Sequence, residues 1–131
     1  MPIQYRIDPD SGVILRRFTG DVTFQDFEEH WSELLNDPDL PDTLTIIADL
    51  RECRLLVHGD EISSLVIDVI EPRLGRRRWF SAVVVAAPVQ YGITKQFIAY
   101  SHGCGVTDVF YDMEEAVEWI RAAARPQNNR D

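Results

Sequence analysis

Residues 79–87 read WFSAVVVAA, and this apolar stretch decides the fold. It contains three consecutive valines, shows no helical spacing of its polar residues, and is followed by Pro88. A short, continuous apolar run of this kind predicts a β-strand that is covered on both faces. Because helices cover both faces of such a sheet, the stretch indicates an α/β fold.

Two more buried strands are predicted, at residues 43–50 (TLTIIADL) and 106–111 (VTDVFY). Each of the three strands is followed by a helical pattern, so we expect them to be parallel neighbours in one sheet. Residues 4–8 and 13–19 flank a Pro-Asp-Ser-Gly turn and predict a hairpin at the start of the chain.

Four helices are predicted from apolar residues at helical spacing. The second is expected to end at Pro72 and Gly75. The resulting order is ββαβαβαβα, which predicts a mainly parallel five-stranded sheet with its first strand antiparallel at one edge. We expect one domain over residues 1–125 and a polar, disordered tail at 126–131. The helices are expected to begin after Thr23, at Gly59 and Asp60, near Gln90 and after Asp112.

Composition excludes several classes of function. The chain has 13 basic and 22 acidic residues, a net charge of −9, which argues against nucleic acid as a partner. No apolar run is long enough to cross a membrane, no signal pattern opens the chain, and the two cysteines are isolated, so we expect a cytoplasmic protein. No spacing typical of a metal site or of a nucleotide cofactor is present, so no metal and no cofactor are expected.

Residues 48–60, ADLRECRLLVHGD, followed by an apolar helix, resemble the STAS domain of SpoIIAA-like anti-sigma-factor antagonists. In that family a strand ending in Asp-Leu leads through a short apolar extension to Asp-Ser-Ser-Gly and a helix. One of these serines is phosphorylated by a kinase that is also an anti-sigma factor. The full order of elements matches as well, so the resemblance implies a SpoIIAA-like fold and a regulatory role by docking to a protein.

The chain departs from the family at the phosphorylated position. Residues 57–60 read Val-His-Gly-Asp and contain no hydroxyl, so the resemblance implies a divergent branch without the family phospho-switch. The core of this superfamily also resembles the CRAL-TRIO and Sec14 proteins. Those proteins take up apolar ligands between their helices and sheet.

Candidate site residues lie at the predicted carboxyl ends of the strands, where open α/β sheets bind ligands. We expect residues 51–60 to form a long connection with an apolar part at residues 55–57. Ile67 and Ile98 lie outside the inward-facing apolar stripes of their predicted helices, and together with residues 55–57 they are expected to form an exposed apolar patch. His58 beside Asp60 could serve as an acid–base pair, but no nucleophile lies nearby in sequence, so a helix cap and a loop residue are the favoured interpretation. The candidate surface comprises Asp49, Arg51, Leu55, Leu56, Val57, His58, Gly59, Asp60, Ile67, Tyr91 and Ile98.

Three functions remain open at this point. The leading hypothesis is a non-enzymatic STAS-like module that docks to a protein partner or to a second copy of itself. The alternative is a carrier or sensor of a small apolar, lipid-like ligand, held in a pocket beneath the second and third helices. The least favoured hypothesis is a small enzyme using His58 and Asp60.

Overall fold

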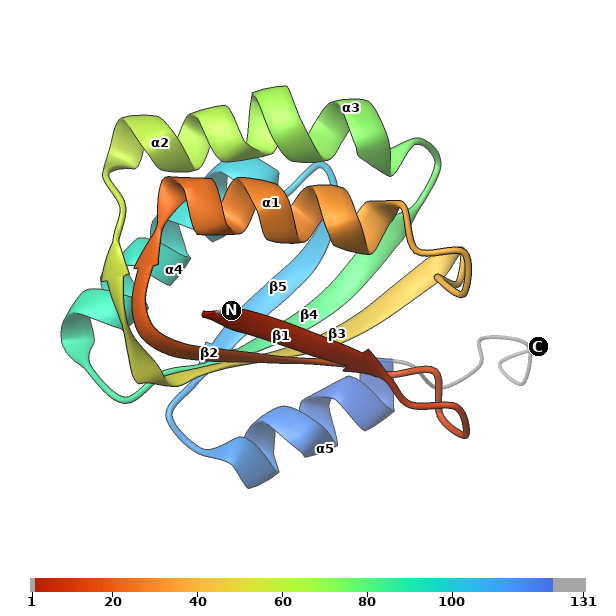
Figure 1. Ribbon diagram of the computed structural model, residues 1–131. Helices are drawn as coiled ribbons and strands as arrows, with labels where there is room; N and C mark the ends of the chain where they lie inside the picture. Colours follow the sequence, from red (N-terminus) through yellow and green to blue (C-terminus); the bar gives the residue numbers. More distant parts are fainter. Residues whose placement is uncertain (1, 124–131) are drawn as a thin grey trace.

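Five strands form one sheet in the order β1-β2-β3-β4-β5 in this computed structural model, which describes residues 2–123 (Figure 1). β1 is antiparallel to β2, and every other neighbouring pair is parallel. The predicted topology is therefore confirmed, including β3, β4 and β5 as parallel neighbours and the antiparallel strand at one edge. The tail at 126–131 lies outside the described residues. The strands are β1 (Ile3–Ile7), β2 (Ile14–Thr23), β3 (Thr43–Leu56), β4 (Arg78–Val84) and β5 (Gly105–Phe110).

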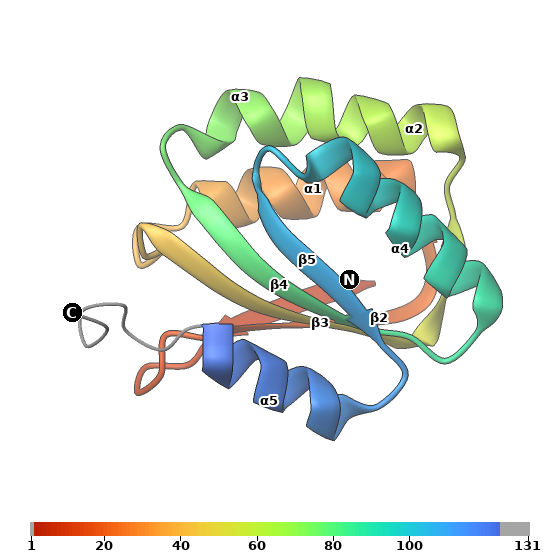
Figure 2. The same ribbon diagram turned by 180° about the vertical axis from the view of Figure 1, so that it is seen from behind.

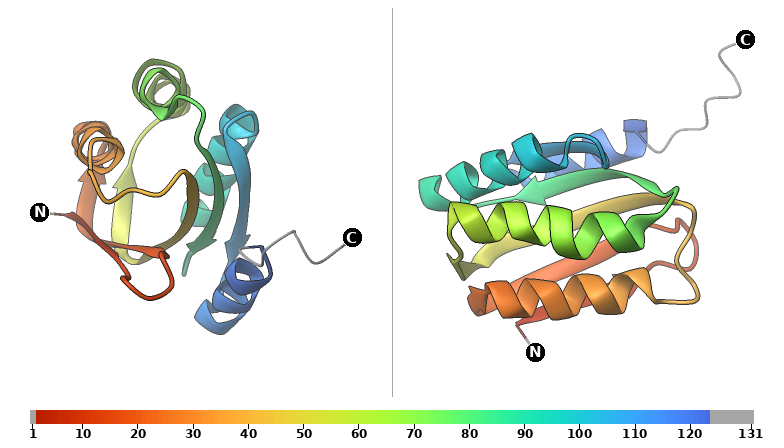
Figure 3. Two further views of the ribbon diagram at one scale, coloured as in Figure 1. Left: turned by 90° about the vertical axis from the view of Figure 1, so that its right-hand side faces the viewer. Right: turned by 90° about the horizontal axis from the view of Figure 1, so that it is seen from above.

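The helices are distributed unequally over the two faces of the sheet. Three helical rods, α1, α2–α3 and α4, lie on one face, and α5 lies on the other (Figures 1, 2 and 3). The larger core and the candidate site both lie on the three-rod face. The helical segments are α1 (Phe24–Leu35), α2 (Gly59–Ser64), η1 (Leu65–Ile70), α3 (Glu71–Leu74), α4 (Pro88–Ser101) and α5 (Met113–Ala123).

Side-chain caps fix the start of two helices where the sequence predicts them. At α1 the Asp26 backbone N–H donates to the Thr23 hydroxyl, and the Thr23 N–H donates to the Asp26 carboxylate at 2.9 Å. At α5 the Glu115 N–H donates to the carboxylate of Asp112 at 3.2 Å. Each cap satisfies backbone donors that have no partner within the helix.

The second helical rod continues through Pro72. Its middle segment, η1, is π-helical: the Glu71 N–H donates to the carbonyl of Val66, five residues earlier. This wider turn lies just before Pro72, which lacks an N–H and whose ring would clash with the carbonyl of Asp68 in a regular helix. The prediction that Pro72 helps to end the helix is wrong. The helix ends at Gly75, whose φ of +66° suits glycine.

β3 carries one extra residue relative to β2. Arg17 pairs with Asp49, whereas Thr19 pairs with Glu52, so the register advances by two residues in β2 and by three in β3. Such a β-bulge exchanges the side chains that point to each face of the sheet.

The bulge and the length of β3 correct the prediction that residues 51–60 form a long connection. β3 continues to Leu56, so only two residues separate it from α2. Leu50 in the bulge and Leu55 after it both pack into the cluster beneath the three-rod face, although they are five positions apart. In a regular strand, residues an odd number of positions apart would point to opposite faces.

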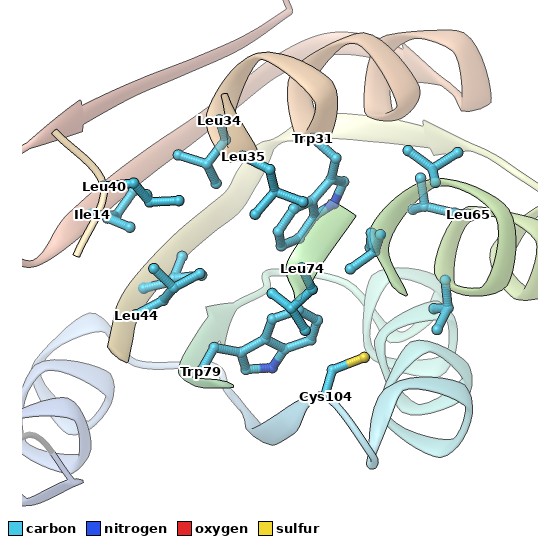
Figure 4. Close-up of a cluster of buried hydrophobic side chains, with 14 residues drawn as sticks. Ile14, Trp31, Leu34, Leu35, Leu40, Leu44, Leu65, Leu74, Trp79 and Cys104 are labelled. Atoms are coloured by element: carbon cyan, nitrogen blue, oxygen red, sulfur yellow. The ribbon is translucent and has the colours of Figure 1, made fainter. Parts of the chain in front are cut away.

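Two tryptophans form the centre of the larger core. The rings of Trp31 in α1 and Trp79 in β4 lie with centroids 5.4 Å apart, among leucines of the sheet and helices (Figure 4). Phe97 of α4 stacks on Trp79 at 5.9 Å, and the Trp79 indole N–H donates to the Thr107 hydroxyl. Packing of this kind joins α1, α4, β4 and β5 through one side chain.

The tight fit around Trp79 generates a prediction. A Cβ at Gly105 would lie 2.7 Å from the Trp79 backbone nitrogen and 2.8 Å from its Cδ1. We expect Gly105→Ala to lower the free energy of unfolding by about 1–3 kcal/mol, the usual effect of overpacking, measured by urea denaturation. Gly103→Ala is the control, because a Cβ there meets nothing within 4 Å and should change stability far less. Equal stabilities for the two variants would contradict this account of the Trp79 contact.

Candidate functional site

A cavity of about 60 Å³ lies between the sheet and the three helical rods on its larger face. Its floor is formed by β2, β3 and β4, for example by Ala48, Leu50 and Val83. Its walls come from α1, α2, η1 and α4, and thirteen of the sixteen lining residues are apolar. The three polar ones are Arg16, Glu61 and Thr94. A concave, apolar space with a few polar groups is the usual form of a small-molecule site.

Arg16 is a buried cation in this cavity. It lies on β2 between Ile14 and Phe18, points to the same face as they do, and is only 6% exposed. Its guanidinium carbon lies 5.0 Å from the ring centroid of Trp31 and 5.4 Å from that of Phe18. Its Nη1 lies 3.3 Å from Nε2 of His30, and within residues 2–123 its Nε has no hydrogen-bond partner. Arg16 also takes part in none of the four ion pairs found in this part of the chain.

His30 on α1 is held neutral behind Arg16. Burial, and then the charge of Arg16, lower the pKa of His30 to about 2. The neutral ring therefore accepts from Arg16 through Nε2, and its Nδ1 has no partner among the described residues. Burial lowers the pKa of Arg16 to about 9, so the guanidinium remains protonated at neutral pH. The site consequently holds one positive charge.

The other two polar lining residues are already engaged. The Thr94 hydroxyl donates to the carbonyl of Gln90 within α4 at 2.8 Å. The Glu61 carboxylate accepts from the N–H of His58 at 3.0 Å and so caps the start of α2. Among the polar side chains that line the cavity, Arg16 is thus the one with unused hydrogen-bond donors.

Gln90 positions α4, which forms one wall of the cavity. Its side-chain oxygen accepts from the N–H groups of Ala86 and Ala87, at 2.7 and 3.2 Å. Its side-chain nitrogen donates to the carbonyls of Leu50 and Cys53 on β3, at 2.7 and 2.8 Å. β4 pairs with β3 only as far as Asp49, so this amide takes the place of a neighbouring strand along the end of β3.

The structure divides the predicted patch. Leu55 is only 8% exposed, so its predicted exposure is wrong: with Val57 it lines the cavity. Leu56, between them, is 42% exposed. The bulge in β3 is the physical reason, because it turns Leu55 toward the helices.

The remaining apolar candidates do not line the cavity. Ile67 is 55% exposed on the outside of η1, and Ile98 is half-buried on α4. Tyr91 is partly exposed and stacks on Tyr111, with ring centroids 5.8 Å apart. The predicted off-stripe position of Ile67 is therefore confirmed, whereas Ile98 is more covered than expected.

Asp49 and Arg51 lie at the start of the bulge and pair with each other. Two Arg51 nitrogens donate to the two carboxylate oxygens of Asp49, both at 2.9 Å. These bonds hold the pKa of Asp49 below its usual range. Asp49 follows Ala48, a cavity residue, and so points to the opposite face of the sheet. The two charges are a local pair outside the cavity.

His58 and Asp60 are exposed at the start of α2, and Gly59 lies between them. The prediction that Asp60 caps this helix is wrong, because Glu61 accepts the hydrogen bond from His58. Within residues 2–123, no cluster of three or more His, Cys, Asp or Glu residues could hold a metal ion. Both cysteines are free thiols.

Sequence reasoning missed Arg16 and Gln90, the two polar residues that define the site. A signal for Arg16 was present in the sequence. It lies two positions from both Ile14 and Phe18, so in a strand its side chain points to the same face of the sheet as these apolar residues. A glutamine at the third position of α4 indicates a helix cap, but no local signal predicts the bonds of Gln90 to β3, because those partners lie 37 and 40 residues away.

Comparison with known structures agrees with this architecture. A search of solved structures finds an uncharacterised protein of the DUF3478 family with a SpoIIAA-like fold, from Shewanella loihica PV-4. The match has a TM-score of 0.54, covers 90% of this chain and 91% of that one, and has 16% sequence identity. No family model and no curated protein matches the sequence. The chain therefore has a SpoIIAA-like fold, as the resemblance of residues 48–60 implies.

No helix within residues 2–123 has both the length and the apolar character needed to cross a membrane.

The buried His30 predicts a particular pH dependence of stability. Between its folded pKa of about 2 and its unfolded value near 6.5, the unfolded chain binds a proton that the folded chain does not. The free energy of unfolding should therefore fall as pH drops below 6.5, by up to about 1.4 kcal/mol per pH unit from this group. His30→Gln should show a flatter profile between pH 6 and 4 in urea denaturation. The carboxylates are the same in the wild type and in His30→Gln, so their contributions cancel when the two profiles are subtracted. Parallel profiles would contradict a buried, neutral His30.

Proposed function

We propose that this protein is a non-enzymatic SpoIIAA-like module that binds a small, mainly apolar ligand, as a carrier or a sensor. The observation that carries the proposal is the cavity itself. It lies beneath α1, α2–η1 and α4, and it is lined by apolar side chains from three helices and three strands. This is the region where the ligand-carrier hypothesis expects a pocket.

The size of the cavity limits how a ligand enters. A space of about 60 Å³ holds a few water molecules or a small fragment, so a larger ligand requires the helices to move away from the sheet. Leu65, the first residue of the π-helical segment, lines the cavity. A π-turn is a common feature of functional sites, and here it provides a part of the wall that can be rearranged by changing helical hydrogen bonds.

The chemistry of the side chains supports binding rather than catalysis. Burial raises the pKa of the Cys53 thiol to about 12, so this thiol is not an activated nucleophile. His30 is neutral and buried, with a pKa too low for proton transfer near neutrality. His58 and Asp60 are exposed and do not line the cavity.

Filling the cavity tests this proposal. Ala48→Val adds two methyl groups to the cavity floor, where Ala48 is 1% exposed, and should leave the free energy of unfolding unchanged or higher. We expect native mass spectrometry of the protein purified from its source to detect a stoichiometric small molecule in the wild type and none in Ala48→Val. The proposal is contradicted if the wild type carries no bound molecule, or if Ala48→Val carries the same molecule as the wild type.

Docking to a protein partner, or to a second copy of the chain, is the second candidate function. Ile67 favours it, because a large apolar side chain that is 55% exposed on a helix surface is available for contact. Ile67 is two residues from the cavity-lining Leu65, so a partner on this surface would contact the same segment as a ligand. A sensor that reports on its ligand needs such a connection between site and surface.

Ile67→Asp separates docking from ligand binding. An exposed substitution usually changes stability by less than about 0.5 kcal/mol, so the variant should fold. If the surface docks a second copy, light scattering after size exclusion should show a wild-type dimer and a monomeric variant, because the charge would be buried without a partner. The ligand detected by mass spectrometry should remain. An unfolded variant, or an unchanged oligomeric state, would remove Ile67 from the docking hypothesis.

A further inference from the structure

The guanidinium of Arg16 is the one strongly charged group buried in the cavity without a partner of opposite charge among residues 2–123. Its Nη1 meets His30 at 3.3 Å, and its Nε has no partner. In an arginine, Nε and Nη2 form the side-on pair of donors that fits a carboxylate. This pair is what His30 leaves unused.

The surroundings compensate the buried charge only in part. The rings of Trp31 and Phe18 lie within cation–π distance, and neutral His30 supplies one acceptor. An ion removed from water still loses several kcal/mol of hydration, which a well-placed counter-ion offsets. A site of this kind is completed by an anion.

We therefore propose, building on the proposed function, that the ligand is a carboxylic acid with an apolar body, whose carboxylate pairs with Arg16. The rest of the lining selects the apolar body, because thirteen of sixteen lining residues are apolar and five of these are aromatic. A single carboxylate matches the single positive charge. A phosphate monoester, which carries −1.5 to −2 charges at neutral pH, would leave excess negative charge buried.

Glu61 sets the orientation of the acid. It is the carboxylate that lines the cavity, it caps α2 through His58, and it is not within ion-pair distance of Arg16. A ligand carboxylate near Glu61 would be repelled. The acid group therefore lies at Arg16, and the apolar body extends toward Val57 and Ile62 at the start of α2.

Calorimetric titration with matched acids and alcohols tests this inference on the full chain. The probes are butyrate, hexanoate and octanoate, each paired with the alcohol of equal length, at neutral pH. A charge-assisted hydrogen bond predicts that the wild type binds the best acid at least about tenfold more tightly than its alcohol. Arg16→Met should lose this preference and still bind the alcohol, because it keeps an apolar wall.

Two more variants keep the test decisive. Arg54→Met removes a cation that is exposed and paired with Asp21 outside the cavity, so the acid preference should be unchanged. Arg16→Lys keeps the charge without the planar pair of donors, so the preference should fall. It also serves if Arg16→Met does not fold, as judged by circular dichroism.

The outcomes distinguish this inference from the proposed function. Equal binding of acid and alcohol by the wild type, or a preference that survives in Arg16→Met, overturns the inference and leaves apolar-ligand binding intact. Tighter binding of octyl phosphate than of octanoate also overturns it. If the wild type binds none of these compounds, both proposals fail.

Discussion

The side-chain amide of Gln90 is the interaction on which the site depends. β3 extends seven residues beyond its last pairing with β4, and its free edge would otherwise leave buried carbonyl groups without donors. Gln90 donates to two of these carbonyls and accepts from the N–H groups of Ala86 and Ala87, just before α4, so all four hydrogen bonds of its amide are made. Gln90 is the third residue of α4, which begins at Pro88. The amide therefore fixes where a wall of the cavity stands relative to its floor.

Arg16 represents the opposite situation. Gln90 is buried and fully satisfied, whereas Arg16 is buried and only partly satisfied. Replacement of a buried charge by an apolar side chain of similar volume is often neutral or stabilising, so the packing alone does not explain an arginine at this position. This contrast between the two residues is the reason for placing the proposed binding site at Arg16.

The sequence predicted the architecture well because the fold depends on patterns that are local in the chain. The apolar runs of β3, β4 and β5 and the helix start after Thr23 are each visible within about ten residues, and each forms the element that was predicted. The site was predicted poorly because it depends on contacts between distant segments. A bulge leaves no signal in the composition, so the neighbours of Leu55 do not show which face of the sheet it points to. Two of the four partners of Gln90 lie in β3, far from it in the chain.

The bulge in β3 also determines which changes in chain length the protein can tolerate. The extra residue lies beside Arg51 and Glu52, whose side chains are exposed. Removing a single residue there would restore regular alternation and turn Leu55 and Val57 toward the α5 side of the sheet. The chain would keep its composition, strand order and helices, yet lose one end of its cavity. The length of the segment between the Asp-Leu of β3 and the start of α2 can be counted in any related sequence. This length therefore predicts whether a related chain retains the pocket.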